Sequence, residues 1–134
     1  MSHPPSALAL VVCDQILNEP GTGKFTLVGL FSTILAGAFP CVHPRMAIYL
    51  ALTDGYGASR VRLRLIDGAT EAVEIWSGQL DLNFTDPRAV NETYLMSGPL
   101  TFPQAGEYRL RVEGPSGIIM ERRIQVGLAP TKPA

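Results

Sequence analysis

The chain has 134 residues, of which 46% are hydrophobic and 17% are charged, and its formal net charge is −1. This length suits one domain with a core large enough to fold without disulfides. A net charge so close to zero lacks the positive field on which binding to nucleic acid or to an anionic membrane depends, so neither partner is predicted. The 13 glycines and 11 prolines, scattered between short apolar runs, favour many strands and turns over helices.

We expect no export signal at the beginning of the sequence. Residues 1–6 contain no lysine or arginine, and the apolar run at 7–12 ends at Cys13-Asp14, which is too short for the hydrophobic region of a secretory signal. No run of about 18 apolar residues occurs, so no membrane-spanning helix is predicted. We therefore expect a cytoplasmic protein in which Cys13 and Cys41 are reduced.

Two segments near the start of the chain predict a β-hairpin. Residues 7–17 are apolar up to Asp14, which is typical of a strand covered on both faces, although a helix is the alternative. A dense turn signal at 18–23 follows, and residues 25–31 then alternate, which favours the strand. Residues 32–37 are expected to form at most one short helical turn, stopped by Gly37 and Pro40.

The middle of the chain alternates with a period of two. Residues 46–52 predict one strand, and residues 60–65 the next, with Val61, Leu63 and Leu65 on one face and Arg60, Arg62 and Arg64 on the other. Asp67-Gly68 is typical of a tight hairpin turn. The apolar phase then changes within residues 73–84, which predicts a bulge near Ser77-Gly78.

Residues 106–126 form the clearest hairpin. Tyr108, Leu110 and Val112 alternate with charged residues that include Arg109 and Arg111, and residues 114–117 form the turn. Beyond the turn, either Arg122 or Arg123 must point toward the apolar face or sit at a bulge, and one of them is expected to extend to the rim. With the earlier segments this makes about eight strands separated by frequent turn signals, a pattern associated with sandwiches.

Two resemblances sharpen the prediction. The segment Ala105-Gly106-Glu107-Tyr108 resembles the tyrosine corner of immunoglobulin-like sandwiches, in which a Tyr hydroxyl bonds to nearby backbone. A further set of motifs resembles, over nearly the full chain, a family of short bacterial β-sandwich proteins with no assigned function: Cys13-Asp14-Gln15, Gly21-Thr22-Gly23-Lys24, Phe39-Pro40-Cys41-Val42-His43-Pro44 and Phe102-Pro103-Gln104-Ala105-Gly106-Glu107-Tyr108. This second resemblance implies no catalytic residue, cofactor or partner.

We therefore predict an all-β protein, an immunoglobulin-like antiparallel β-sandwich of about eight strands at residues 7–127. Residues 1–6 are expected to be extended or disordered, and residues 128–134 to form a flexible Pro-rich tail.

Catalytic and metal-binding patterns are weak in this sequence. Gly21-Thr22-Gly23-Lys24 lacks the earlier glycine, the following Ser or Thr and the helix of a phosphate loop, so it is read as a hairpin turn. Cys41 and His43 could contribute to a metal site or a nucleophilic pair, but on an extended segment their side chains lie about 7 Å apart. We expect a protein without enzymatic activity, metal or cofactor.

Two binding functions remain open. The arginines of the two strands could form an anion-binding or acidic-partner surface, with Trp76, Tyr49 or Tyr56 completing a ligand site, or glutamates opposite could neutralise them: Arg60, Arg62, Arg64, Arg109 and Arg111. The favoured function is a protein-interaction or structural module. The apolar residues Val28 and Leu30 would form a partner face or edge strand, and a homodimer is the expected assembly.

Overall fold

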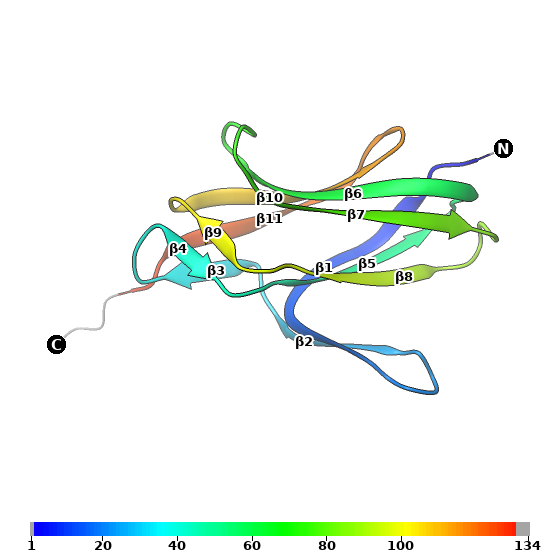
Figure 1. Ribbon diagram of the computed structural model, residues 1–134, viewed down its shortest axis with the longest axis horizontal. Helices are drawn as coiled ribbons and strands as arrows, with labels where there is room; N and C mark the ends of the chain where they lie inside the picture. Colours follow the sequence, from blue (N-terminus) through cyan, green and yellow to red (C-terminus); the bar gives the residue numbers. More distant parts are fainter. Residues whose placement is uncertain (1, 131–134) are drawn as a thin grey trace.

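The computed structural model describes residues 2–130, which form eleven strands and no helix (Figure 1). The strands are β1 (Ser6–Asn18), β2 (Phe25–Leu30), β3 (Thr33–Ala36), β4 (Cys41–His43), β5 (Ala47–Thr53), β6 (Gly57–Asp67), β7 (Glu74–Phe84), β8 (Asn91–Met96), β9 (Leu100–Phe102), β10 (Gly106–Gly114) and β11 (Gly117–Leu128). The prediction of an all-β protein is confirmed. The strands beyond the expected eight include β3, β4 and β9, which have only three or four residues and so too few positions for a periodic pattern.

Two larger sheets lie one above the other (Figure 1). The first has the strand order β2-β1-β5-β8, the second has the order β3-β11-β10-β6-β7, and β4 pairs with β9 in a small third sheet. The core lies between the two large sheets, since buried side chains from β1 and β5 belong to one apolar cluster with those from β6, β10 and β11.

Alternation decides which side of each strand enters the core. On β6, Val61, Leu63 and Leu65 are all 0% exposed, while the arginines between them face outward. Tyr108, Leu110 and Val112 on β10 are buried in the same way. Burying a side chain of this size contributes about 1.5–3 kcal/mol to stability, so both strands keep the register in which every second residue faces the core.

The predicted first hairpin is confirmed, because β1 pairs antiparallel with β2 and, on its other side, with β5. The helical alternative for residues 7–17 is therefore wrong. Gly29 in β2 has a φ of 72°, and a Cβ there would lie 2.4 Å from Oδ2 of Asp14. Only glycine fits at this position. The β1–β2 hairpin as a whole projects from the body of the molecule (Figure 1).

The segment expected to allow a short helical turn is instead strand β3, which pairs parallel with β11. Ile34 and Ala36 are buried, whereas Thr33 and Leu35 are exposed. A strand places both buried residues on the core side at once. The backbone also gains a partner at the edge of the second sheet, which a single helical turn would lack.

Two local predictions differ in position. The bulge in β7 lies at Ile75, because Leu65 pairs with Trp76 and Ile66 with Glu74, whereas we expected it near Ser77-Gly78. The tight turn at Asp67-Gly68 is wrong, since β7 starts only at Glu74. The Asp67 carboxylate accepts hydrogen bonds from Ala69 N (3.1 Å) and Thr70 Oγ1 (2.7 Å), which stabilises a wider loop.

Tyr108 makes the contact expected of a tyrosine corner. Its hydroxyl donates to the carbonyl of Gln104 at 2.7 Å, and its ring packs edge-on against Phe102 at a centroid distance of 5.0 Å. The side chain is only 2% exposed. The hydrogen bond fixes the chain where it enters β10.

Both ends of the described chain are attached to the sheets. His3 N donates to the Tyr56 carbonyl at 2.8 Å, and Tyr56 N donates to the His3 carbonyl at 3.0 Å. At the other end β11 continues to Leu128, and Ala129 N donates to the Ala36 carbonyl at 2.7 Å. Of the tail predicted at 128–134, residues 131–134 lie outside the described residues.

Candidate functional site

The structure brings together the two strands that carry the predicted arginine surface. We call this row the arginine ladder: Arg60, Arg62 and Arg64 on β6, and Arg109 and Arg111 on β10. β6 and β10 are neighbours in the second sheet, and Arg64 is directly opposite Arg111. Arg109 and Arg62 lie on the same outer face, and Arg60 extends the row toward the start of β6. The adjacency that an anion-binding surface requires is therefore present.

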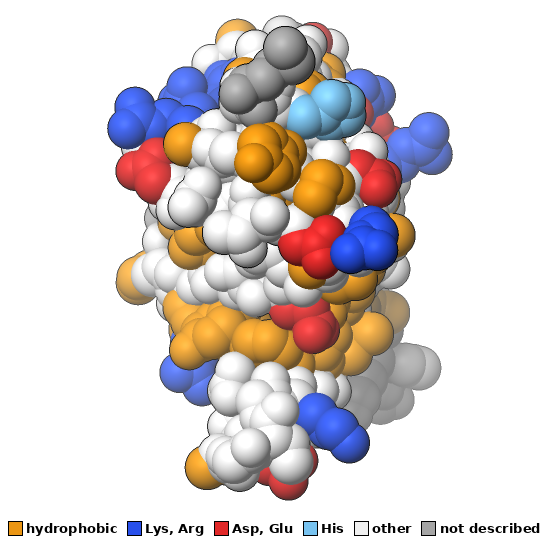
Figure 2. Space-filling view, turned by 90° about the vertical axis from the view of Figure 1, so that its right-hand side faces the viewer, with side chains coloured by type: hydrophobic (Ala, Val, Ile, Leu, Met, Phe, Trp, Pro, Cys, Tyr) orange, Lys and Arg blue, Asp and Glu red, His pale blue; other side chains and the backbone are white. Residues whose placement is uncertain are grey.

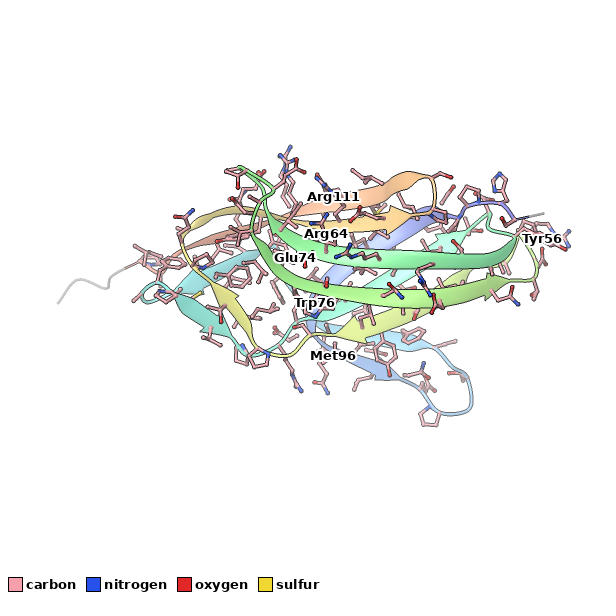
Figure 3. The ribbon with its side chains drawn as sticks, turned by 45° about the horizontal axis from the view of Figure 1, so that its top comes forward. Tyr56, Arg64, Glu74, Trp76, Met96 and Arg111 are labelled. Carbon is pink, nitrogen blue, oxygen red and sulfur yellow. The ribbon has the colours of Figure 1, made fainter. Side chains whose placement is uncertain are left out.

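Carboxylates occupy the spaces between these guanidinium groups. Each arginine of the ladder, and Arg123 on the neighbouring strand β11, lies within 4.0 Å of at least one carboxylate. The pairs are Arg60 with Asp81, Arg62 and Arg64 with Glu74, Arg64 also with Glu113, Arg109 with Glu107 and Glu121, Arg111 with Glu71 and Glu121, and Arg123 with Glu107. Figure 3 shows Arg64, Glu74 and Arg111 near one another on this face.

The outer face of the second sheet is thus a balanced ion-pair network. The hydrogen bond from Arg111 is the largest cause that holds the pKa of Glu71 below its ordinary value, and the hydrogen bond to Glu74 raises the pKa of Arg64. Cross-strand pairs of opposite charge stabilise a sheet modestly. Because every ladder arginine already has a carboxylate partner, this face offers little unbalanced positive charge to an anionic ligand.

The aromatic residues considered for a ligand site do not converge on the ladder. Trp76 packs over Gly78, where a Cβ would lie 2.8 Å from the indole and 3.4 Å from Leu95 Cδ1 of β8. A side chain at position 78 would thus meet both Trp76 of β7 and Leu95 of β8, and these two strands are edges of the two large sheets. Tyr56 lies at the far end of the molecule from Trp76 (Figure 3), and Tyr49 lies in the other sheet.

The end of the β1–β2 hairpin covers part of the outer face of the first sheet. Phe25 packs edge-on against Tyr49 and Tyr94, with ring centroids 5.7 Å and 5.8 Å apart. Figure 2 shows a band of hydrophobic side chains between the body and the projecting hairpin. The aromatic residues at 25, 49 and 94 are visible in the sequence, but no local pattern links them.

The predicted partner face remains open. Val28 and Leu30 of β2 are 42% and 63% exposed, respectively. β2 is an edge strand, because its one partner in the sheet is β1. Its sequence, Phe25–Leu30, contains no charged residue. A solvent-exposed apolar edge of this kind is available for pairing with another chain.

Beside Leu30 lies a hollow that the sequence did not reveal. It has a volume of about 190 Å³ and is lined by Val11, Val12, Leu30, Phe31, Ser32 and Arg122. A neighbouring hollow of about 280 Å³ shares Leu30 and Phe31 and is also lined by Asp14 and His43. Arg122 is the arginine that faces inward, opposite Leu110, which resolves the choice left open between it and Arg123.

The cysteines and the glycine-rich turn form no chemical site in the described part of the chain. Cys13 and Cys41 are free thiols, and burial raises the pKa of Cys13. His43 packs against Phe31, with ring centroids 5.5 Å apart. Residues 2–130 contain no group of three or more side chains placed to hold a metal ion. The turn at 21–24 closes the β1–β2 hairpin through a Glu19 N to Lys24 carbonyl hydrogen bond of 2.8 Å.

Comparison with known proteins gives a family without an assigned activity. None of the described residues forms a helix that could span a membrane. No curated protein matches the sequence. A family model described as "Family of unknown function (DUF6941)" matches residues 8–126, from β1 to the end of the core-forming part of β11. Since this match covers most of the chain, the protein belongs to the DUF6941 family.

Proposed function

We propose that this protein is a non-enzymatic interaction module that pairs with a second copy of itself through strand β2. The observation that carries the proposal is the uncharged, exposed edge of β2, with Val28 and Leu30 on its surface. We also propose that it acts in the cytoplasm. The free thiols of Cys13 and Cys41 support that location, because disulfides are rare in a reducing compartment.

The edge of β2 lacks the features that usually prevent strand-to-strand association. Natural edge strands are protected by charged side chains, by proline, by shortness or by a covering element. β2 has six residues without charge or proline, and its hairpin projects from the body of the molecule (Figure 1). Gly29 is its one irregularity, which leaves residues 25–28 as a regular segment.

The other sheet edges are better protected. β7 carries Glu74 and Asp81, and β8 carries Glu92. β3 is uncharged but has only four residues. Among the described edge strands β2 therefore combines length and an absence of charge, and it is the preferred site for a partner strand.

A two-fold axis beside β2 would place two copies of the strand antiparallel. The two four-stranded sheets would then continue into one another, and the backbone groups at both edges would be satisfied. Leu30 and Val28 of each copy would lose contact with water. A formal net charge of −1 on each chain gives little repulsion between the copies.

We further propose that the two sheets form an immunoglobulin-like sandwich. The order β1-β5-β8 matches strands A, B and E of that fold, and β11-β10-β6-β7 matches G, F, C and C′. Tyr108 supports the assignment, because it lies near the start of the strand that corresponds to F. Immunoglobulin-like domains host many unrelated functions, so the fold itself does not select one.

The test is the solution mass of the purified protein by light scattering over a range of concentrations. We expect wild type to approach twice the chain mass of 14.5 kDa as concentration rises. Leu30→Asp should remain at the single-chain mass, because a carboxylate cannot be buried unpaired in the contact.

Ile118→Asp is the matched control. Ile118 is 58% exposed, close to the 63% of Leu30, but it lies on β11 at the turn with β10. This variant, and Arg62→Glu on the charged face, should associate like wild type. A wild-type protein that stays at 14.5 kDa at high concentration would show that β2 is not a self-association site.

A further inference from the structure

Three buried side-chain polar atoms make no hydrogen bond within the described residues: His43 Nε2, Ser59 Oγ and Arg122 Nε. Two of them belong to residues that line the hollows on either side of Leu30 and Phe31. Buried polar atoms in folded proteins are nearly always hydrogen-bonded, so unpaired ones indicate a missing partner. Their concentration at one place points to a polar molecule that binds there.

Arg122 is the more demanding of the two residues. It faces inward from β11, and its Nη1 donates to the Leu10 carbonyl of β1 at 3.2 Å. No carboxylate of the described residues lies within 4.0 Å of its guanidinium group, unlike the arginines of the charged face. A partly buried cation without a counter-charge is unfavourable, because its hydration is lost and no anion replaces it.

The contact with Leu10 determines which side of the guanidinium group is free. Nη1 is directed at the backbone of β1, so the opposite edge, formed by Nε and Nη2, has no partner in the described chain. These two N–H groups are parallel, which is the arrangement that binds both oxygens of a carboxylate. Nε is itself buried, so the side chain must turn for both groups to reach a ligand in the hollow. A carboxylate needs only these two donors, whereas phosphate requires donors from several directions.

The surroundings of Arg122 indicate what the rest of the ligand is like. Apart from Arg122 and Ser32, the side chains that line its hollow are apolar: Val11, Val12, Leu30 and Phe31. Its volume of about 190 Å³ corresponds to about six water molecules at ~30 Å³ each. This space accommodates a short hydrocarbon chain attached to the carboxylate, but not a lipid.

We propose that Arg122 binds the carboxylate of a short aliphatic carboxylic acid, whose hydrocarbon chain packs between Leu30 and Phe31. The site lies within one chain and does not require self-association. It differs from the anion site considered for the arginine ladder, where carboxylates of the protein already balance the charge.

Calorimetric titration of the full chain with butyrate tests the proposal, with acetate, octanoate and inorganic phosphate as comparison ligands. Wild type should bind butyrate more tightly than acetate, because the chain buries apolar surface, and octanoate should gain no further affinity, because the rest of its chain stays in water outside the hollow. Arg122→Met keeps the volume but removes the charge. It should lose at least about tenfold in affinity, the lower limit for a hydrogen bond to a charged group.

Arg62→Gln is the matched control, because Arg62 lies on the exposed charged face and should not affect butyrate binding. If Arg122→Met fails to fold, NMR of wild type decides the matter: butyrate should shift the amide signals of Val11, Val12 and Ser32. Absence of binding to folded wild type, equal binding by Arg122→Met, or equal affinity for phosphate would each overturn the proposal.

Discussion

The Tyr108 hydroxyl provides a direct test of how the chain is held at the start of β10. Tyr108→Phe removes one oxygen atom and the hydrogen bond to the Gln104 carbonyl, which measures 2.7 Å. The ring remains, and so does its packing against Phe102. Any loss of stability therefore reports on the hydrogen bond alone.

The expected loss of unfolding free energy is about 1 kcal/mol. A buried hydrogen bond contributes about 0.5–1.5 kcal/mol net, and more is lost when the remaining partner stays buried and unsatisfied. Here the remaining partner belongs to Gln104, an exposed residue whose carbonyl can turn toward water. For a domain of this size the loss corresponds to a decrease in Tm of about 4 °C.

Urea denaturation followed by the fluorescence of Trp76, the single tryptophan, measures the effect. Tyr56→Phe removes the same atom from a side chain that is 47% exposed, and should change the unfolding free energy by less than about 0.3 kcal/mol. Equal stability of Tyr108→Phe and wild type, or an equal loss in Tyr56→Phe, would refute the role of this hydrogen bond. Tyr108→Ala should cost about 3–5 kcal/mol, because the ring is lost as well.

Two further changes have defined outcomes. Gly78→Ala places a Cβ 2.8 Å from the Trp76 ring, so the half-buried indole must be displaced, and its emission maximum should shift to longer wavelength as it meets water. The second change concerns Tyr49. Burial and the hydrogen bond that its hydroxyl donates to the Glu92 carboxylate raise the pKa of Tyr49 from 10.0 to about 12. The unfolded chain loses this proton first as the pH rises, so stability should fall between about pH 10 and 12 in wild type, and less in Tyr49→Phe, as measured by urea denaturation at each pH.

Much of the second sheet follows from local sequence. The strict alternation of β6 and of β10 reveals which residues enter the core, because a side chain on the wrong face would expose an apolar group to water. The glutamates expected opposite the arginines are those that pair with them, including Glu74 with Arg64 and Glu121 with Arg111. Charge patterning within each hairpin was sufficient for these two pairs, whereas the pairs Arg64–Glu113 and Arg111–Glu71 join segments that are distant in the sequence.

Other features of the structure depend on contacts between segments that are distant in the sequence, so local patterns did not predict them. Strand β3 has too few residues for a periodic signal, and its pairing with β11 joins residues about 90 positions apart. The packing of Phe25 on Tyr49 results from the bend of the first hairpin, which no alternation predicts. Ile75 is bulged because the partner strand, and not its own sequence, sets the register.

By itself the sequence determined the strand class, the inward and outward faces of the long strands, and the uncharged character of residues 25–30. These properties arise from side chains a few positions apart, whose periodicity is a local quantity. Only the tertiary structure decided that β2 lies at an edge and that Arg122 faces inward with no carboxylate of residues 2–130 beside it. Both depend on which strands become neighbours, and that choice is made by the packing of the whole core.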